Sequence, residues 1–165
     1  SMSEITISGY RPGAIGKLVE LHGTYYSHHW NFGIQFESMV AAEMGEFHSR
    51  FNPATDGFWL AMDGEKIVAS VAIDGSRHET EGARLRWFIA DEAYAGTGLG
   101  NRLMNEAMEF CRRNGFKRVY LRTIVGLLAA RHLYDKFGFK LVEEHPSETF
   151  GAPAIEQLFE VILTD

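Results

Sequence analysis

Three glycines at alternate positions, Gly96, Gly98 and Gly100, join a strand-like run of the sequence to a helix-like run. Glycine lets the backbone curl so that successive N–H groups point at one spot, and the first turn of the following helix adds free N–H groups and a partial positive charge. The turn is therefore predicted to hold a phosphate group without any lysine. The alternative, that these glycines only shape a tight strand-to-helix connection, stays open on the glycines alone.

Two common nucleotide-binding motifs do not fit this turn. The dinucleotide fingerprint requires a glycine three positions after its second glycine, where this chain has Asn101. The ATP-type loop requires a Gly-Lys-Ser/Thr run after four intervening residues, and the segment has no such run. The turn is therefore assigned to neither nucleotide class.

Other reactive side chains carry weaker signals. His28 and His29 are neighbours that point in different directions on a helix, and no Asp, Cys or His partner has the spacing of a metal ligand, so no metal site is expected. Cys111 lies on the apolar face of a predicted helix. It is expected to pack in the core and not to act as a nucleophile.

The composition is that of a soluble globular protein, with 45% hydrophobic and 23% charged residues. A length of 165 residues predicts one domain that covers residues 1–165. The formal net charge of −6 disfavours a nonspecific grip on DNA, so no direct nucleic-acid binding is expected. No apolar run approaches the roughly 18 residues that cross a bilayer, so no membrane contact is expected.

The start of the chain and its single cysteine give expectations about location. Ser1 ahead of Met2 is expected to be the remnant of a removed tag, and the next residues lack the basic and apolar stretches of a signal peptide. One cysteine excludes an intrachain disulfide and any Cys-rich zinc site. The reducing cytoplasm is the expected location.

Hydrophobic spacing divides the chain into strands, with a period of two, and helices, with a period of three to four. The predicted strands cover residues 5–7, 58–62, 66–73, 83–90, 119–121, 139–143 and 155–162, and the predicted helices cover 12–29, 36–51, 98–113 and 127–137. Asp63-Gly64 predicts a hairpin turn. This order predicts an α/β (α+β) fold, a mixed sheet of about seven strands flanked by four helices, with parallel or mixed pairing around Gly115 and Gly138.

Three segments, in this order, resemble the GCN5-related N-acetyltransferase (GNAT) superfamily. The run from Phe88 through the glycine turn to Leu103 resembles the acetyl-CoA pyrophosphate loop of that family, and the strand Val119-Tyr120-Leu121 follows it. The run Ala129–Phe139 resembles the family's A-x-x-L-Y-x-K-x-G-F helix end. More narrowly, Arg84–Ile89 and the stretch to Glu144 are similar to acetyltransferase domains fused behind MarR-type winged-helix regulators, and this chain has no room for that DNA-binding half.

The resemblance implies acetyl transfer from acetyl-CoA, the co-substrate, to an amine. In such folds the fourth and fifth strands splay, and the pantetheine arm lies between them against backbone groups that also polarise the thioester carbonyl. The implied acetyl-CoA-binding residues are Phe88, Ile89, Ala90, Ala95, Gly96, Thr97, Gly98, Leu99, Gly100, Asn101 and Arg131. Two positions depart from the family pattern: Ala95 stands where Arg or Gln is usual, which weakens the expected phosphate grip, and Leu127 stands where Asn is often found.

The resemblance also implies that a primary amine attacks the thioester directly, without a covalent enzyme intermediate. Tyr134 is the expected general acid for the departing thiolate, because a phenol with a pKa near 10 keeps its proton at neutral pH. The alternative is that Tyr134 only packs on the sheet. An alkylammonium must lose a proton before it attacks, and the candidate bases are His78, Glu79 and Glu81, with solvated loop residues as the alternative.

Family members shape the acceptor pocket between the first two helices, where this chain has a cluster of aromatic and polar residues: His22, Tyr25, Tyr26, His28, His29 and Trp30. Of this cluster Tyr25, His29 and Trp30, together with Glu81, are expected to contact a small-molecule or peptide amine whose identity stays open, and a solvated helix end is the alternative for the cluster. A homodimer through residues 155–162 is a further expectation. The alternative function is a catalytically weak acyl-CoA-binding sensor or interaction module, which Ala95 favours.

Overall fold

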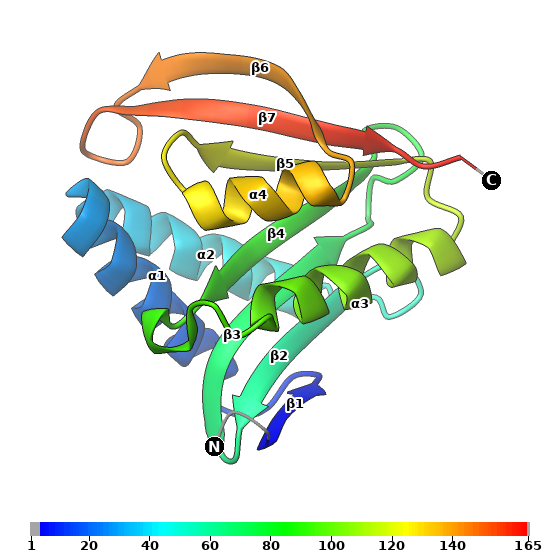
Figure 1. Cartoon of the computed structure of the whole chain (residues 1–165), viewed down its shortest axis with the longest axis horizontal. Coiled ribbons are helices and arrows are strands. Elements are labelled where there is room, and N and C mark those ends of the chain that lie inside the picture. Colours follow the sequence, from blue (N-terminus) through cyan, green and yellow to red (C-terminus); the bar gives the residue numbers. More distant parts are fainter. Residues whose placement is uncertain (1–3, 165) are drawn as a thin grey trace.

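The computed structural model describes residues 4–164, so the expected tag remnant Ser1 lies outside the described residues. The chain forms one seven-stranded sheet with strand order β1-β2-β3-β4-β5-β7-β6 (Figure 1). The elements are β1 (Ile5–Ser8), α1 (Ala14–Trp30), α2 (Ile34–Ser49), β2 (Gly57–Asp63), β3 (Lys66–Asp74), β4 (Ala83–Ala90), the 3-10 turn η2 (Glu92–Tyr94), α3 (Leu99–Arg113), β5 (Arg118–Ile124), α4 (Leu128–Lys136), β6 (Lys140–Ser147) and β7 (Ala154–Ile162). The predicted mixed sheet and element order are confirmed.

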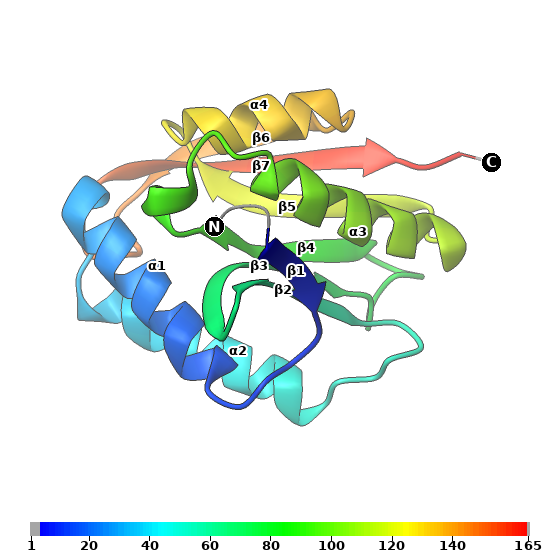
Figure 2. The ribbon, with the colours of Figure 1, turned by 60° about the horizontal axis from the view of Figure 1, so that its bottom comes forward.

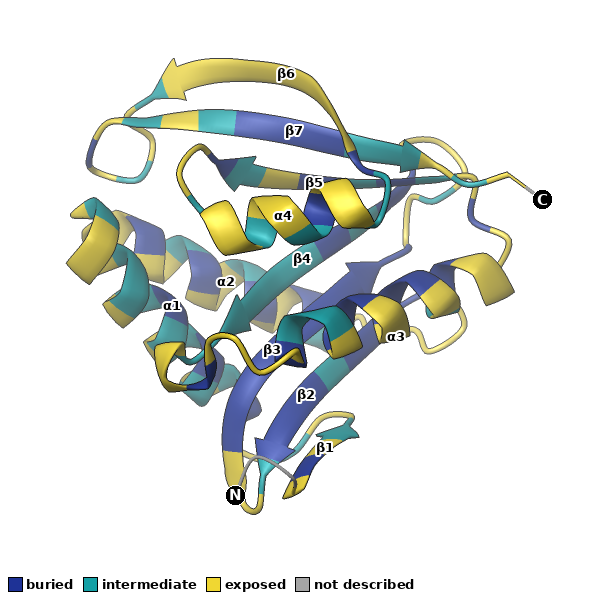
Figure 3. Cartoon of the chain, viewed as in Figure 1, coloured by how far each residue is buried: buried dark blue, intermediate teal, exposed yellow. Residues whose placement is uncertain are grey.

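Helices cover both faces of the sheet: α1 and α2 lie on one face, and α3 and α4 lie on the other (Figure 2). Each layer has its own apolar cluster. Leu103 and Met108 of α3 pack with Tyr134 of α4 in one cluster, and Leu18 of α1 packs with Phe47 of α2 in the other. The central strands are therefore buried between the layers, whereas β6 is largely exposed (Figure 3). No helix within the described residues combines the length and apolar character that a membrane crossing needs.

The central parallel strands β4 and β5 separate soon after they begin. They pair only at Ala83↔Val119 and Arg84↔Tyr120. Beyond these pairs β4 continues to pair with β3, and β5 continues to pair with β7. A gap therefore opens in the middle of the sheet, between residues 85–90 and residues 121–124.

A bulge in β4 lies at the edge of this gap. Trp87 has a φ of 50°, and the register between β3 and β4 shifts between Ser70 and Ala72. The Ser70 hydroxyl donates a hydrogen bond to the Trp87 carbonyl oxygen over 2.7 Å. Because the bulge adds one residue, Arg86 and Trp87 both face α1 and α2, and Phe88 faces α3 and α4.

Strand β7 lies between β5 and β6 and is antiparallel to both. The strands on either side of α4, β5 and β6, therefore do not pair with each other. The strands on either side of α3, β4 and β5, are the parallel pair predicted around Gly115. Both backbone edges of β7 are used, so residues 155–162 cannot pair with a second copy through the backbone, and the dimer stays a prediction. The free edge belongs to β6, which extends to Ser147 and tolerates Pro146 because edge strands have spare N–H positions.

Asp74, at the end of β3, ties α2 to β4. Arg50, just after α2, donates to Asp74 Oδ1 over 3.2 Å and to Oδ2 over 2.8 Å, and Ser76 donates to Oδ1 over 2.8 Å. Arg86 of β4 donates to Oδ2 over 3.3 Å. Burial disfavours the charged carboxylate, but the hydrogen bonds from Arg50 and Ser76 outweigh it and lower the pKa of Asp74 to about 2.

Replacing Asp74 by Asn is expected to lower the free energy of unfolding by about 2 kcal/mol at pH 7, because two arginines lose a shared carboxylate. A lowered carboxyl pKa stabilises the fold above the unfolded-state pKa of about 4. That stabilisation is lost as the pH falls through about 2.

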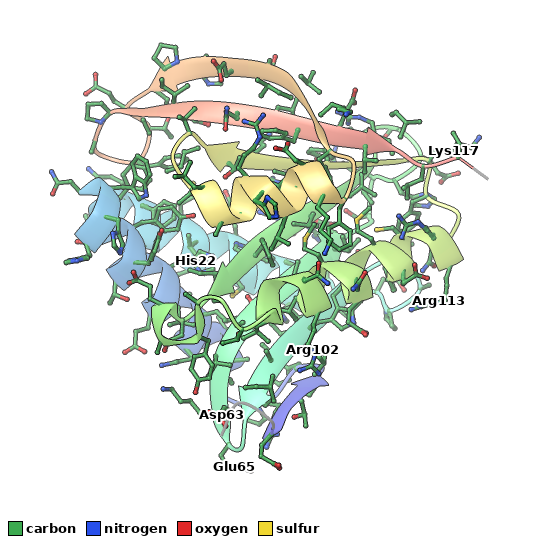
Figure 4. All side chains as sticks on the ribbon, in the orientation of Figure 1. His22, Asp63, Glu65, Arg102, Arg113 and Lys117 are labelled. Atoms are coloured by element: carbon green, nitrogen blue, oxygen red, sulfur yellow. The ribbon has the colours of Figure 1, made fainter. Side chains whose placement is uncertain are left out.

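Urea unfolding of the wild type and Asp74→Asn between pH 7 and pH 2 should show the difference in free energy shrinking below about pH 4. The control Glu65→Gln removes an exposed carboxylate in the β2–β3 turn (Figure 4) and should change the free energy by less than about 0.5 kcal/mol. A difference that stays constant down to pH 2 would contradict this account of Asp74.

Candidate active site

The glycine turn between η2 and α3 presents a run of free backbone donors. Gly96 and Gly98 take the left-handed conformation, with φ values of 74° and 80°. Within residues 4–164, no group accepts a hydrogen bond from the N–H groups of residues 96–101, whereas the next N–H on each side is bonded, Ala95 to Glu92 O and Arg102 to Gly98 O, each over 3.1 Å. These donors lie at the positive end of α3, and the arrangement suits an anionic group such as a phosphate.

Neighbouring side chains hold the turn in place. The Thr97 hydroxyl donates to the carbonyl oxygen of Tyr94 over 2.7 Å, and the Tyr94 hydroxyl donates to Asp63 Oδ2 over 2.5 Å. A Cβ atom on Gly100 would lie 2.9 Å from Cδ1 of Leu133 and 3.2 Å from Cζ of Phe88. A side chain at this position would therefore displace Leu133 of α4 or Phe88 of β4, both of which pack closely on the start of α3.

A lysine of α4 reaches the start of α3. Lys136 Nζ donates to Asn101 Oδ1 over 2.5 Å, so its ammonium group contacts the last residue of the turn. Arg131 donates to Asp135 Oδ1 over 3.1 Å instead, and its guanidinium lies over the Phe159 ring. Lys136 was not among the expected binding residues, although it is the lysine of the helix-end motif.

The gap between β4 and β5 also exposes backbone groups. The N–H of Asp91 donates to Val68 O of β3 over 2.8 Å. Successive residues of a strand point their backbone groups to opposite sides, so those of Ile89 face β3 and those of Phe88 and Ala90 face the gap. An extended ligand in the gap therefore has polar partners at Phe88 and Ala90.

A cavity of about 340 Å³ opens where the two strands diverge. Its aromatic lining comes from Tyr26, Phe32, Phe36, Trp87, Phe88 and Phe150, and its polar lining comes from His22, Glu43, Arg84, Arg86, Arg122, Thr123, Tyr134, Thr149 and Glu156. Helices α1 and α2 form one wall, and β4, β5 and α4 form the others. The cavity thus joins the two faces of the sheet through the gap.

Tyr134 of α4 lines this cavity and is 5% exposed. Its ring packs against Phe88, Phe139 and Phe159, with centroids about 6 Å apart. Burial raises the pKa of Tyr134 above its ordinary value, and a side-chain hydrogen bond with Thr123 opposes part of that rise. The phenol therefore keeps its proton at neutral pH.

The expected acceptor residues lie outside the cavity lining. His29 Nε2 lies 2.8 Å from Glu92 Oε1, and the Tyr25 ring packs on His29. Trp30 lines a separate hollow beside Pro146 and Ile155.

The candidate bases that precede β4 are also distant from the cavity. Glu81 pairs with Arg77 over 3.1 Å, and the His78 ring packs on Phe116. Glu81 and His78 come before the start of β4, whereas the gap lies beside the residues of β4 that follow Arg84. The structure therefore does not bring Glu79 or these two residues into the lining of the cavity.

Two other residues of the cluster at the end of α1, Tyr26 and His22, do line the cavity. His22 Nδ1 lies 2.7 Å from Leu18 O, which only accepts hydrogen bonds, so Nδ1 carries the proton and Nε2 carries none. Burial lowers the pKa of His22 to about 4, and this neutral form holds at pH 7. Both residues follow the buried Leu18 at four-residue intervals, so a helical projection of the sequence places them on the core side of α1.

The described part of the chain offers neither an accessible cysteine nor a cluster of metal-ligating side chains. Cys111 is fully buried in the α3 layer, as predicted, and burial raises its thiol pKa to about 12. Residues 4–164 contain no group of three or more His, Cys, Asp or Glu side chains placed to hold a metal ion.

Comparison with known proteins places these features in a family. A sequence model of the acetyltransferase (GNAT) family matches residues 17–139. The N-acetylaspartate synthetase of Xenopus tropicalis is 32% identical over 105 residues, which are 62% of this chain and 38% of that protein, so the chain spans about two-fifths of the relative's length.

Two solved structures share the fold. The Salmonella typhimurium protein yncA with its cofactor acetyl-CoA superposes with a TM-score of 0.75 at 13% identity, over 98% of this chain and 95% of that one. Spermidine N-acetyltransferase from Vibrio cholerae, in complex with CoA and spermine, superposes with a TM-score of 0.71 at 18% identity, over 97% and 96%. The family match covers most of the described chain, and it includes the glycine turn, both diverging strands and Tyr134: the chain belongs to the GNAT family of acetyltransferases.

Proposed function

We propose that this protein is an N-acetyltransferase that moves the acetyl group of acetyl-CoA to a primary amine. The observation that carries the proposal is the run of free N–H donors at residues 96–101 beside a gap in the sheet that leads to the buried Tyr134. The yncA structure, which was solved with its cofactor acetyl-CoA, supports the choice of donor.

The residues around the turn and gap fit acetyl-CoA. The N–H groups of residues 96–101, with Lys136 beside them, suit its pyrophosphate. The backbone groups of Phe88 and Ala90 suit the amides of the pantetheine arm. Ile89, whose backbone faces β3, and Arg131, which is paired with Asp135, have weaker support. When bound, acetyl-CoA supplies an acetyl group activated as a thioester.

The chain's own side chains supply the proton transfers in this proposal. Tyr134 donates the proton of its hydroxyl oxygen to the departing sulfur, and the proton that the nitrogen loses as the amide forms returns to this oxygen, directly or through a water molecule. The carboxylates that line the cavity are Glu43, which is paired with Arg86 over 2.6 Å, and Glu156, which has no cation within 4.0 Å among residues 4–164. Glu156 is therefore proposed to take the proton of the acceptor ammonium, directly or through a water molecule.

The names of the similar proteins leave the acceptor open. One relative is named for N-acetylaspartate and one fold neighbour for spermidine. The narrower similarity to domains fused to MarR-type regulators and the cytoplasmic location stay predictions from the sequence.

The second candidate function is an acyl-CoA sensor without turnover, which the uncharged Ala95 favours. Calorimetric titration with acetyl-CoA, combined with a thiol-release assay over a panel of amines, separates the two. Binding with release supports the transferase, and binding without release on any amine supports the sensor. If acetyl-CoA does not bind, both are wrong.

Gly98→Ala is expected to weaken acetyl-CoA binding about 10- to 100-fold, because a methyl group at the turn displaces a phosphate from one or two charge-assisted hydrogen bonds. Gly64→Ala in the β2–β3 turn is a matched control. Both glycines have positive φ, 80° and 61°, and neither Cβ would meet an atom within 4 Å. Thermal unfolding should show a similar loss of stability for both variants. Equal acetyl-CoA affinity in the two variants, measured by calorimetry, would contradict the assignment of the turn.

Tyr134→Phe is expected to lower kcat about 100-fold or more, because the leaving sulfur loses its proton donor, and to leave the Kd for acetyl-CoA unchanged. Since the pKa of Tyr134 is raised, the wild-type rate should show no loss from its ionisation up to about pH 10. Tyr10→Phe, at an exposed tyrosine, is the control and should keep the wild-type kcat. A Tyr134→Phe enzyme with unchanged kcat at all pH values would remove Tyr134 from the chemistry.

Glu156→Gln is expected to lower kcat/KM about 100-fold at pH 7 for an alkylamine that is mostly protonated. The loss should be much smaller for an amine that is already unprotonated at this pH, because that acceptor needs no base before it attacks. Steady-state kinetics with both amines distinguishes this role from a structural one, which would lower both rates alike. Glu148→Gln, at an exposed residue outside the lining of the main cavity, serves as the control.

A further inference from the structure

Three arginines line the cavity, and one of them is fully used within the protein. Arg86 donates to Glu43 over 2.6 Å and to Asp74 over 3.3 Å, and its guanidinium lies 4.2 Å from the centroid of the Trp87 ring. Its side chain is 8% exposed. Arg86 therefore has a structural role and little capacity left for a ligand.

Arg84 has no such partners. No carboxylate lies within 4.0 Å of it among residues 4–164, and its Nε atom is buried without a hydrogen-bond partner. Burial, and then the neighbouring charge of Arg86, lowers the pKa of Arg84. A charged side chain whose buried nitrogen has no hydrogen-bond partner is energetically costly. A ligand that enters the cavity can supply the missing acceptor.

Arg122 lies near Arg84, on the neighbouring strand β5. Arg84 pairs with Tyr120 of β5, and Arg122 follows two residues later, so alternation places its side chain on the same face of the sheet. Arg122 is exposed at the mouth of the cavity and has no carboxylate within 4.0 Å in the described chain. The two free guanidinium groups thus come from the two strands that separate.

This pair is directed away from the proposed phosphate site. Arg84 and Arg122 lie on the face that α1 and α2 cover, as the ion pair of Arg86 with Glu43 of α2 shows for the same side of β4. The free N–H donors of residues 96–101 begin α3, on the opposite face (Figure 2). The arginines are therefore available to the acceptor and not to the phosphates of acetyl-CoA.

We infer that the acceptor is a small amino acid, a molecule that carries a carboxylate as well as its amine, and that Arg84 and Arg122 bind this carboxylate. The inference rests on the proposed function and names the substrate class of the same site. Guanidinium groups match the planar carboxylate with paired hydrogen bonds. The aromatic residues Tyr26, Phe36 and Phe150 line the rest of the cavity and accommodate an apolar part of the acceptor.

The charges that line the cavity disfavour a polycationic acceptor. A polyamine would place several ammonium groups near Arg84, Arg86 and Arg122, and only Glu43 and Glu156 among the lining side chains carry negative charge. Since Glu43 is already paired with Arg86, the wall between β4 and β5 repels a polycation.

The experiment compares acceptors that differ only in the carboxylate. Glycine and L-phenylalanine are each paired with their amides, glycinamide and L-phenylalaninamide, and spermidine is the polycationic probe. For at least one pair, kcat/KM for the carboxylate form should exceed that for the amide at least about tenfold. The amine of the amide is less basic, so a larger fraction of the amide is present as free amine. This difference favours the amide, so it cannot explain a preference for the carboxylate form. Amides or spermidine accepted as well as, or better than, the amino acids would overturn the inference.

Two variants assign the effect to the arginines. Arg84→Met and Arg122→Gln should each lower kcat/KM for the preferred amino acid about 10- to 100-fold, mainly through KM, and leave the amide within about twofold. Arg113→Gln, at the far end of α3 (Figure 4), is the matched control and should keep wild-type kinetics. Equal losses on the amino acid and its amide would show a structural effect and overturn the assignment.

Two further measurements keep the inference testable apart from turnover. Arg84→Met should unfold at the same temperature as the wild type or higher, because it removes an unpartnered buried donor, so lost activity cannot be ascribed to unfolding. N-acetyl-L-phenylalanine should bind the CoA-saturated protein at least about tenfold more tightly than its amide, and Arg84→Met should abolish that difference. No preference in this binding experiment contradicts the inference, whereas loss of acetyl-CoA binding by the wild type contradicts the proposed function itself.

Discussion

The interrupted pairing of β4 and β5 is the constraint on which the site depends. A sheet that stayed closed would satisfy the backbone groups of Phe88 and Ala90 and leave no passage between its faces. The bulge at Trp87, held by Ser70, bends β4 at the same point. The helices then form two separate layers, and the proposed function assigns one to the phosphates of acetyl-CoA and the other to the acceptor.

The charged groups of the acceptor layer divide into those that support the fold and those that remain unsatisfied. Asp74 gathers Arg50 and Arg86 and so joins α2 to the middle of the sheet. Arg84 lies two residues before Arg86 in β4, but it lacks any carboxylate partner within residues 4–164. A protein selected only for stability would have little reason to keep such a side chain, so the contrast between the two arginines separates structural from ligand-directed charge.

Much of the fold was predictable because its elements are strongly periodic. The α3 helix has buried residues at regular three- to four-residue spacing. The Asp63-Gly64 pair marks the turn of the β2–β3 hairpin directly. The glycine turn was also readable, since Gly96 and Gly98 need a positive φ. The insertion of β7 between β5 and β6 was not, because local spacing carries no information about which distant strands become neighbours. The lining of the cavity was predicted less well. One residue along α1 turns the side chain by about 100°, so Tyr26 lines the cavity and Tyr25 does not. Nothing in the spacing of β4 marks its bulge.

The close packing at Gly100 sets the distance between two parts of the site. Leu133 and Phe88 both lie where a side chain would stand, and Leu133 is the immediate neighbour of Tyr134. The glycine therefore lets the loop that suits the diphosphate pack directly against the helix that carries the phenol, and this contact helps to fix their separation. A carrier whose arm is shorter or longer than this span would have its reactive end held out of line with the phenol, however well its anionic end were bound.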